Sequence, residues 1–499
     1  MGIRRLLLGI SFFVCGLRAL SQPVDWTGDM TLFGTAGNES LPAMSARPAS
    51  ARLHAFCVCG VTLCSKTSNN AGADWSVCDT MNGTISEPRV EATADGQYDY
   101  AFVTGASDVK TLYRFAGSQN SWQGALLRAV AAGCTGTVQC AAISTDALAP
   151  SSDSLVGICW LERQPDTDLY SLWFVRSHDL GNTFEPEQPL AAFESPDAQL
   201  QKVGITVSWL GSAARWIVAA PIHRAGSIPE EIRVFTSDDQ GATWGDSTEV
   251  DNATFAQREV SLAAYEQTVM LVYSRRINAG TQRDIFLSYS PDGGLHFSPP
   301  IAVTDSLADE HDPRVVISDD GATCSIVYLA DNSVDLPATV YLRQCAVATP
   351  WEIGVPLMIS EAGGATRDGG LCAAATGFGP AVAWTSQFPT GDTDVKFDAE
   401  WRGEDTPGRI AVLPDRSFIG QNYPNPFNGF TVVPLTLDRG RSVTLSVYDV
   451  TGRMVMSRDV GYLGAGSHRI PLELTGLPSG AYWTRMESAA PARTMILLK

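Results

Sequence analysis

Short runs of β-branched and aromatic residues recur along residues 50–400, separated by turns rich in glycine, aspartate, asparagine and proline. This alternation predicts short β-strands, and no helical periodicity interrupts it. Seven runs of one kind are HAFCVCG (54–60), YAFVTG (100–105), LVGICWLE (155–162), WIVAAPIH (216–223), VMLVYSRR (269–276), CSIVYLAD (324–331) and AVAWTSQ (381–387). Each is followed by a second run: VTLCSKTS, KTLYRFAG, LYSLWFVRS, EIRVFTS, DIFLSYS, TVYLRQC and DVKFDAEW. Paired units spaced by roughly 45 to 60 residues are typical of a β-propeller.

Two of the units match in detail. PRVEATADGQYDYAFV begins at Pro88 and PRVVISDDGATCSIVY begins at Pro313. Both place Asp-Gly seven residues after the proline, at Asp95-Gly96 and Asp320-Gly321. Each stretch therefore reads as the first strand, the tight turn and the second strand of one blade.

The seven strand pairs predict seven blades, with a six-bladed ring as the alternative. The last unit reaches DVKFDAEW and is followed by no fourth strand of its own. The early segment DMTLFG (29–34) could pair with that unit and close the ring without leaving an exposed strand edge. A six-bladed ring would require one strand pair to be an insertion.

A second pattern, Ser-x-Asp-x-Gly-x-Thr-aromatic, follows several of the second runs. It is complete at two sites, nearly complete at a third and degraded at a fourth. An aspartate or serine in a tight turn accepts hydrogen bonds from backbone N–H groups just ahead, and glycine adopts positive φ there. We therefore expect each turn to fasten the hairpin between the third and fourth strands, with its aromatic ring packed between sheets. The residues concerned are Ser68, Asn70, Gly72 and Trp75; Ser177, Asp179, Gly181, Thr183 and Phe184; Ser237, Asp239, Gly241, Thr243 and Trp244; and Ser290, Asp292, Gly294 and Phe297.

This turn resembles the Asp box of the repeats of bacterial neuraminidases, which occur in sialidase-like propellers. The resemblance implies the fold, because a catalytic site would not need several copies of its loop around a ring. A calcium loop is the alternative, but each turn offers one or two carboxylates where Ca²⁺ prefers six or more oxygen ligands.

The catalytic residues of a sialidase are harder to find in this sequence than the Asp-box turns. The resemblance would imply three arginines for the substrate carboxylate, a Tyr–Glu pair, an acid/base aspartate and a Phe/Tyr-Arg-Ile-Pro motif before the first Asp box. Nothing before Ser68 matches that motif, and Arg-Ile-Pro occurs only at 469–471, near the C-terminus. The sequence therefore argues against sialidase activity while favouring the sialidase-like architecture.

Charged residues gather where the first strand of several units begins. Because strands alternate in direction, these positions lie on the face opposite the turns and near the central funnel. They could bind a sugar or an acidic ligand, and paired carboxylates could hydrolyse a glycosidic bond. Solvated rim charges with local salt bridges are the alternative interpretation. The candidate funnel residues are Glu87, Arg89, Arg258, Glu259, Glu310, His311, Asp312, Arg314, Arg367 and Asp368.

The C-terminal part reads as a separate module. A linker rich in proline, glycine and charge (403–420) follows the predicted propeller (22–402), and alternating strands from 421 to 499 predict a small sandwich. This module resembles the type A sorting domain of type IX secretion in its Ig-like form. The resemblance implies export and contact with the type IX machinery; an accessory adhesive domain is the alternative. The matching residues are 422–428 (NYPNPFN), Tyr448-Asp449-Val450, Gly452-Arg453, Gly466-Ser467-His468, Gly476-Leu477, Ser479 to Tyr482 and Leu497-Leu498-Lys499.

The N-terminus and the cysteines agree with export. Residues 1–21 have a basic start, a short apolar run and small residues at the end, which is typical of a cleaved signal peptide. Ten of the eleven cysteines follow it, and an exported chain favours disulfides. Cys134–Cys140 is the first pair that we expect. A zinc site formed by Cys57, Cys59, Cys64 and Cys78 with His54 is the rival interpretation.

Three functional classes stay open on these grounds. The sequence favours a secreted or cell-surface propeller that binds glycan or protein without catalysis. A sialidase-like glycoside hydrolase or lyase and a structural or adhesive surface component are the alternatives. A net charge of −19 and a pI of about 4.7 argue against nucleic acid or an anionic membrane as partner. No motif predicts a cofactor or a metal site.

Overall fold

The computed structural model contains strands and turns throughout the residues that it describes. Within this part of the chain no helix is long and apolar enough to cross a membrane. The residues described are 25–26, 30–34, 38–47, 50–81, 89–95, 98–104, 110–116, 126–129, 137–145, 155–164, 167–194, 202–210, 213–223, 230–278, 280–331, 338–360, 365–366, 370–377, 379–387, 392–401, 418–419, 422, 425, 427, 429–437, 441–463, 466–486 and 489–498. The expected signal peptide and most of the expected linker lie outside these residues.

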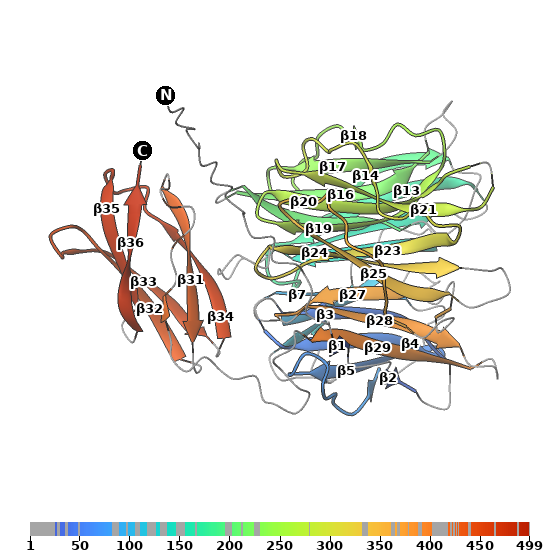
Figure 1. Cartoon of the computed structure of the whole chain (residues 1–499), viewed down its shortest axis with the longest axis horizontal. Helices are drawn as coiled ribbons and strands as arrows, with labels where there is room; N and C mark the ends of the chain where they lie inside the picture. The colour runs from blue at the N-terminus through green and yellow to red at the C-terminus, as the bar shows by residue number, and fades with distance from the viewer. Residues whose placement is uncertain are drawn as a thin grey trace, which may run out of the picture.

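The body of the protein consists of antiparallel sheets that follow one another along the chain (Figure 1). In the described residues six of them have four strands each. They are β3 (Glu39–Ala46), β4 (Leu53–Cys59), β5 (Thr62–Ser68) and β6 (Asp79–Thr80); β7 (Arg89–Ala94), β8 (Tyr98–Thr104), β9 (Lys110–Ala116) and β10 (Leu126–Ala129); β11 (Thr137–Thr145), β12 (Val156–Arg163), β13 (Leu169–Ser177) and β14 (Gln188–Glu194); β15 (Gly204–Leu210), β16 (Ala213–Ile222), β17 (Glu231–Ser237) and β18 (Thr248–Glu249); β19 (Gln257–Tyr265), β20 (Thr268–Arg276), β21 (Arg283–Ser290) and β22 (Ile301–Ala302); β23 (Asp309–Ile317), β24 (Thr323–Asp331), β25 (Thr339–Ala346) and β26 (Leu357–Met358).

One further sheet joins the two ends of the body. Its later strands are β27 (Leu371–Ala375), β28 (Pro380–Gln387) and β29 (Thr393–Trp401). The early strands β1 (Asp25–Trp26) and β2 (Met30–Phe33) both pair with β29, with Met30 opposite Phe397. They lie beside β29 in Figure 1 although the whole body separates them in the sequence. The early segment therefore completes the last sheet at the place that the sequence predicted.

The innermost strands form a closed circuit of contacts. β3, β7, β11, β15, β19, β23 and β27 each contact the next, and β27 contacts β3. Between every two neighbouring sheets lies a cluster of buried apolar side chains, so that each sheet packs on both faces. The cluster between the last sheet and the first includes Phe33, Leu53 and Phe397, all buried. Ring closure thus rests on both a strand pair and an apolar core.

The four turns of the Ser-x-Asp pattern, one of which has Asn70 in place of the aspartate, share the hydrogen bonds to their backbone N–H groups. In the turn after β17, Ser237 Oγ lies 2.8 Å from Asp239 Oδ1 and accepts from Gly241 N at 2.8 Å. Asp239 in turn accepts from Thr243 N at 2.8 Å and from Thr243 Oγ1 at 2.6 Å. The serine-to-glycine bond recurs at 2.8 Å in the other three turns. The carboxylate or amide oxygen therefore collects the donors that a tight turn leaves unsatisfied.

Each turn also reaches across to the preceding sheet. Gly241 has φ +82°, and a Cβ there would lie 2.7 Å from the Phe174 ring. Trp244 packs edge-to-face on the same ring, with centroids 4.8 Å apart. In the turn after β5, Trp75 packs in the same way on Phe397 of the last sheet, at 5.1 Å. The glycine is needed for its backbone conformation and for this close approach.

The cysteines of the first sheet form a small cluster. Cys59 and Cys64 are joined by a disulfide, and Cys57 Sγ lies 3.5 Å from Cys59 Sγ. His54 lies one residue out of phase, stacks on Phe56 and faces Asp99 with its ring nitrogen 3.6 Å away. Successive side chains of a strand point to opposite faces, so His54 does not complete a zinc site with these sulfurs. The expected Cys134–Cys140 pair involves Cys134, which lies outside the described residues.

The C-terminal part is a two-sheet sandwich with its own core. One sheet contains β30 (Phe418–Ile419), β31 (Phe430–Leu437) and β34 (Gly466–Glu473). The other contains β33 (Met454–Leu463), β32 (Arg441–Tyr448), β35 (Gly480–Met486) and β36 (Ala489–Leu497). Buried residues of both sheets form one cluster, which includes Val433, Leu445 and Leu472. The first strand of the sandwich thus begins inside the range that the sequence assigned to the linker.

The NYPNPFN segment fastens the last strand of this sandwich. Asn425 Oδ1 accepts from Ile496 N at 2.8 Å, and Asn425 Nδ2 donates to Thr494 O at 3.2 Å. The backbone of Phe427 exchanges hydrogen bonds with Ile496 O and Leu498 N. Two of the segments that carry the sorting-domain resemblance, one near Asn425 and one at the end of the chain, therefore lie side by side.

Replacing Asp239 with alanine should lower the free energy of unfolding by about 1 kcal/mol, since it removes the acceptor of the turn. Calorimetry of the purified protein would measure this change. Asp246→Ala is a matched control, because Asp246 is an exposed carboxylate in the same connection and should change stability little. An unchanged melting temperature combined with abolished ligand binding would contradict the structural role of the turn.

Candidate functional site

The ten funnel residues predicted from the sequence divide into two groups. Glu87, Arg367 and Asp368 lie outside the described residues, and Arg89 begins β7 with a side chain that the structure does not describe. The other six are on β19 and β23. These strands begin on the face opposite the Ser-x-Asp turns. In the fifth sheet the turn starts at Ser290, which pairs with the start of β20, whereas Arg283 pairs with the end of β20. Because β19 and β20 are antiparallel, β19 begins beside the end of β20, away from the turn.

Both strands contain a bulge where the charged residues stand. The register shifts between Arg258 and Ser261 in β19 and between His311 and Arg314 in β23. Glu259 and Asp312 have φ values of 55° and 52°, a conformation that non-glycine residues rarely adopt. A bulge turns a side chain away from the regular alternation of the strand. The positive φ values therefore set where these two carboxylates point.

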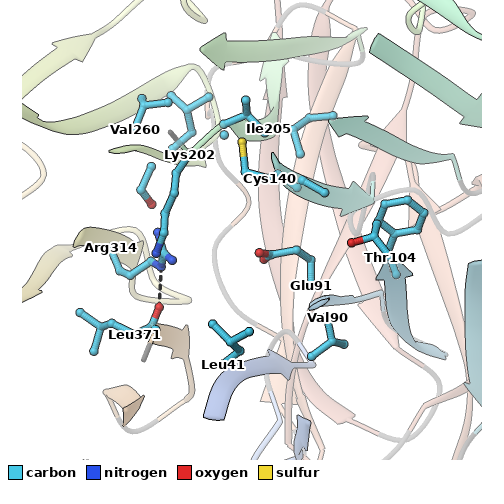
Figure 2. A pocket seen from close by; sticks show the side chains of 18 of the residues that line it. Leu41, Val90, Glu91, Thr104, Cys140, Lys202, Ile205, Val260, Arg314 and Leu371 are labelled. Atoms are coloured by element: carbon cyan, nitrogen blue, oxygen red, sulfur yellow. Dashed lines mark hydrogen bonds between the residues drawn. The ribbon is translucent and has the colours of Figure 1, made fainter. Parts of the chain in front are cut away.

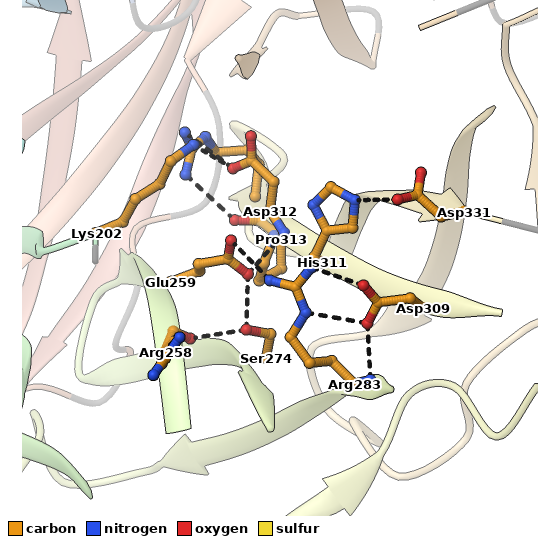
Figure 3. A network of polar contacts seen from close by, with 11 residues as sticks. Lys202, Arg258, Glu259, Ser274, Arg283, Asp309, His311, Asp312, Pro313 and Asp331 are labelled. Atoms are coloured by element: carbon orange, nitrogen blue, oxygen red, sulfur yellow. Dashed lines mark hydrogen bonds and ion pairs between the residues drawn. The ribbon is translucent and has the colours of Figure 1, made fainter. Parts of the chain in front are cut away.

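The carboxylate of Glu259 connects the sheet of β19 with the sheet of β23 (Figure 3). Its Oε2 accepts from Ser274 Oγ at 2.7 Å and from the backbone N of Asp312 at 3.1 Å. Its Oε1 lies 3.3 Å from Arg283, which also forms a two-pronged pair with Asp309 at 2.8 and 3.0 Å. Burial alone would lower the pKa of Arg283, but Asp309 and Glu259 hold it above the ordinary value. Glu259 is therefore occupied on both oxygens.

Asp312 is the second centre of the network. It pairs with Lys202, which precedes β15, and with Arg314 Nη2 at 3.2 Å. Burial alone would raise the pKa of Asp312, but Arg314 and Lys202 lower it. Lys202 and Asp312 come from two sheets that are separated by the sheet of β19, so this ion pair links sheets that are not neighbours. Charges of opposite sign thus compensate one another at the mouth of the ring, the end at which β19 and β23 begin.

The remaining predicted residues also have partners. Arg258 Nη2 lies 3.5 Å from Glu230 Oε2, with both side chains buried. His311 Nε2 lies 3.5 Å from Asp331 Oδ2. Burial lowers the pKa of His311, but Asp331 and Glu259 raise it above the ordinary value overall. These charged residues are therefore largely buried and form ion pairs within and between sheets, unlike the solvated rim charges with local salt bridges that the sequence offered as an alternative.

A cavity of about 190 Å³ lies at the centre of the ring. Residues from all seven innermost strands line it, among them Leu41 on β3, Gln139 on β11 and Ile205 on β15. Figure 2 shows Arg314 and Lys202 on one side of this cavity, and the carboxylate of Glu91 on β7 pointing toward them from the other. Arg314 Nε donates to Leu371 O at 2.7 Å, which fixes the guanidinium. The cavity thus has a basic wall and an acidic wall.

A pair of carboxyl groups lies away from the cavity, between β21 and β23. Asp284 and Glu310 are buried, and Asp284 Oδ1 and Glu310 Oε2 accept no hydrogen bond from any donor in the described part of the chain. Burial raises the pKa of Glu310 to about 7; hydrogen bonds from Ser306 and Thr304 oppose the rise and Asp284 adds to it. Burial also raises the pKa of Asp284. One carboxyl group that keeps its proton can donate to the other.

Several members of this site were missed by sequence reasoning. Glu91 and Lys202 lie in the cavity wall, and Arg283 and Asp309 hold the network together. Arg283 begins the third strand of its unit, and because strands alternate in direction, third strands start on the same face as first strands, which could have identified it. Lys202 stands alone in the sequence, and no local signal indicates its contact with Asp312.

The pKa of Glu310 predicts how stability depends on pH. Its pKa near 7 in the folded protein exceeds the value of about 4.3 expected for an unfolded chain. The stabilisation from its proton is therefore complete below pH ~4.3 and is lost as the pH rises through 7. We expect the melting temperature to fall by roughly 2–4 °C between about pH 5.5 and 8.5 from this contribution. Glu310→Gln should flatten that decline in scanning calorimetry.

The exposed Glu352 gives a matched control for this measurement, because Glu352→Gln should leave the pH profile as it is. Asp284 belongs to the same pair, and because burial raises its pKa as well, the decline with pH reports the pair and not Glu310 alone. A Glu310→Gln variant with an unaltered slope would show that Glu310 is ionised in the folded protein throughout this range.

The C-terminal sandwich matches a known family. Residues 421–496 match the family of the secretion system C-terminal sorting domain. No curated protein matches the sequence. The match agrees with the motif residues at 422–428 and at the end of the chain, which the structure places in contact.

Solved structures with a similar arrangement share little sequence. A fungal alcohol oxidase of the AA5 family in complex with copper is 10% identical, with 95% of this chain and 100% of that chain covered and a TM-score of 0.48. A Hadza microbial sialidase is 11% identical, with coverages of 73% and 66% and a TM-score of 0.36. The Aleuria aurantia fucose-binding lectin, a six-bladed propeller, is 11% identical, with coverages of 66% and 97% and a TM-score of 0.39. Likeness at this level transfers no activity. The protein joins a β-propeller body to a C-terminal sorting domain of type IX secretion, and it is exported to the cell surface or secreted.

Proposed function

We propose that this protein is an exported, seven-bladed Asp-box propeller that binds a glycan or protein ligand in its central cavity without catalysing a reaction. The blade number is supported by the six four-stranded sheets, the sheet that joins both ends, and the closed circuit of innermost strands. The Ser-x-Asp turns act as structural fasteners in this proposal, which the serine-to-glycine hydrogen bond that all four turns share supports.

The observation that carries the proposal is the small number of carboxylates in the cavity. Glu91 is the one acidic residue among the described residues that line it. Glycoside hydrolysis generally needs two carboxyl groups, about 5 to 9.5 Å apart on either side of the bond that breaks. Glu259 and Asp312 stand nearby, but ion pairs and backbone hydrogen bonds occupy them. This arrangement favours binding over hydrolysis.

The cavity offers the groups that a polar ligand requires. Thr104, Gln139 and Ser261 add hydroxyl and amide groups to the charged walls, and Phe102 adds an apolar surface. Sites of this kind fix a ligand with a few convergent polar groups on an otherwise apolar surface. A single sugar unit at the end of a glycan chain fits this combination, as does one polar side chain of a protein partner.

The C-terminal sandwich completes the proposal. We infer that it has the Ig-like form of the type IX sorting domain and that its role is export, separate from ligand binding. Its own apolar core supports this division, because every residue of that core lies between Ile419 and Leu497. None of the cysteines is in the tail, so no disulfide ties it to the body.

Glu91→Gln should weaken binding to a glycan or protein ligand by roughly tenfold, since it removes the acidic wall of the cavity and leaves its shape. A glycan array would identify the ligand, and titration of the purified protein would measure the change. Glu352→Gln is the matched control. Unchanged binding in the Glu91 variant, or turnover of chromogenic glycosides by the wild-type protein, would overturn the proposal.

A chain that ends at Gly403 should fold and unfold cooperatively with the melting temperature of the body, because the two parts have separate cores. In the native host the same truncated chain should stay in the periplasm, which cell fractionation would show. Arrival of the truncated chain at the cell surface would assign the sandwich to binding or adhesion instead of export.

A further inference from the structure

A second hollow lies on the outer rim of the ring, between the third and fourth sheets along the chain. Its volume is about 490 Å³, within the range of small-molecule sites. Residues of β14 form one wall, and β17 with the connection to β18 forms the other. This rim groove, defined by Gln188, Leu190, Arg233, Phe235, Trp244 and Ser247, shares no residue with the central cavity.

The lengths of the outermost strands make the groove. β14 has seven residues, whereas β18 has two and pairs only with Arg233 and Val234. The long strand therefore forms a wall beside a sheet whose own outer strand is short. β14 also has a bulge, because Leu172 pairs with Ala191 and Trp173 with Pro189, which leaves Leu190 as the extra residue. Leu190 lines the groove from this bulge.

The floor of the groove is apolar and rigid. Phe235 is 6% exposed, and Trp244 is half-buried and fixed by its edge-to-face contact with Phe174. The Trp244 Nε1 atom is buried without a hydrogen-bond partner in the described residues. The indole therefore offers the groove its carbon surface, and a fixed aromatic surface costs little entropy when a ligand packs on it.

The rim above this floor is polar and already oriented. Arg233 Nε donates to Ser247 Oγ at 3.1 Å, Arg233 Nη2 donates to Ser247 O at 2.8 Å, and Glu231 pairs with the same guanidinium at 3.2 Å. The charge of Arg233 is therefore compensated within its own sheet. Across the groove, the half-buried Gln188 amide forms no hydrogen bond with another described residue. That amide has donors and an acceptor to offer.

The edge of β14 does not favour a peptide as the occupant. A peptide would add a strand to an open sheet edge and use its backbone hydrogen bonds. Pro189 has no N–H to offer such a strand, and the bulge at Leu190 breaks the regular ladder. The ligand must therefore be held by side chains, with a flat apolar side on Trp244 and polar groups at its edge.

We propose that the rim groove is a binding site for a neutral carbohydrate of one or two sugar units. The C–H face of a sugar ring packs on the fixed indole of Trp244. Its hydroxyl groups, which both donate and accept, bond with the Gln188 amide and the Arg233 and Ser247 side chains. The ligand is neutral, because the guanidinium of Arg233 is already paired and the exposed carboxylate of Asp246, which also lines the groove, would repel an anion. This site is independent of the central cavity and does not rest on the function proposed for it.

Saturation-transfer NMR of the full mature chain with lactose, maltose, cellobiose and diacetylchitobiose tests this proposal. We expect at least one of these neutral disaccharides to bind. Gln188→Ala should weaken that binding by roughly tenfold, and Gln188→Trp should abolish it by filling the groove. Thr248→Ala is the matched control, because Thr248 is exposed beside Ser247 and does not line the groove.

The outcomes separate the two sites. Binding that survives Gln188→Trp, or the absence of binding by all four disaccharides, would overturn the rim groove. Binding that is lost in Glu91→Gln and kept in both Gln188 variants would place the sugar in the central cavity, which overturns the rim groove and leaves the proposed function standing. Equal melting temperatures of the variants would confirm that the changes are local.

Discussion

No sheet of the body can be stable alone, because every sheet buries both of its faces against neighbours. The buried clusters lie between sheets and not within them, as the shared core of Phe33, Leu53 and Phe397 illustrates. In a linear array of such units the two end sheets would each leave an apolar face in water. The pairing of β2 with β29 removes both ends at once. The cavity, the charged mouth and the rim groove all depend on that closure, since each is formed by strands of different sheets.

The mouth of the ring shows how charges can be buried in such an architecture. Glu259 and Asp312 are largely removed from solvent, and a buried charge without a partner would be strongly destabilising. Asp312 pairs with Lys202 from the sheet of β15, while Glu259 pairs with Arg283 of its own sheet and accepts a hydrogen bond from the backbone of Asp312 in the next sheet. The network therefore holds sheets together through ion pairs and hydrogen bonds. Glu91 lies in the cavity wall, and its carboxylate points toward Arg314 and Lys202 from the other side (Figures 2 and 3).

The repeated part of the architecture could be predicted from the sequence because its signals are local. Strand runs, Asp-Gly turns and the Ser-x-Asp pattern each occupy a few consecutive residues, and the structure forms the turns with the expected hydrogen bonds at Ser237 and Asp239. The segment 29–34 could be placed because the last unit lacked a strand. The outermost strands were less predictable, since β6, β18, β22 and β26 have only two residues each.

The charged site was predictable only in part. Glu259, Glu310 and Asp312 lie near the starts of β19 and β23, which are the positions that the strand pattern of the sequence indicated. Their partners did not follow, because Lys202 is 110 residues from Asp312 and the bulges that aim the carboxylates have no sequence signal. Glu259 and Asp312 adopt positive φ although they are not glycines. Backbone preference alone would therefore have predicted no bulge at either position. Packing between sheets overrides that preference.

The early position of β1 and β2 in the chain has a consequence for export. A chain that crosses the inner membrane from its N-terminus delivers these two strands first and their partner β29 last. Until residue 401 has crossed, β2 and the open face of the first sheet have no partner, and unpaired strands of this kind promote aggregation. The sorting domain follows β29, so it emerges only after the ring has all its strands. Any chain that has been synthesised as far as this domain therefore already contains every strand of the ring.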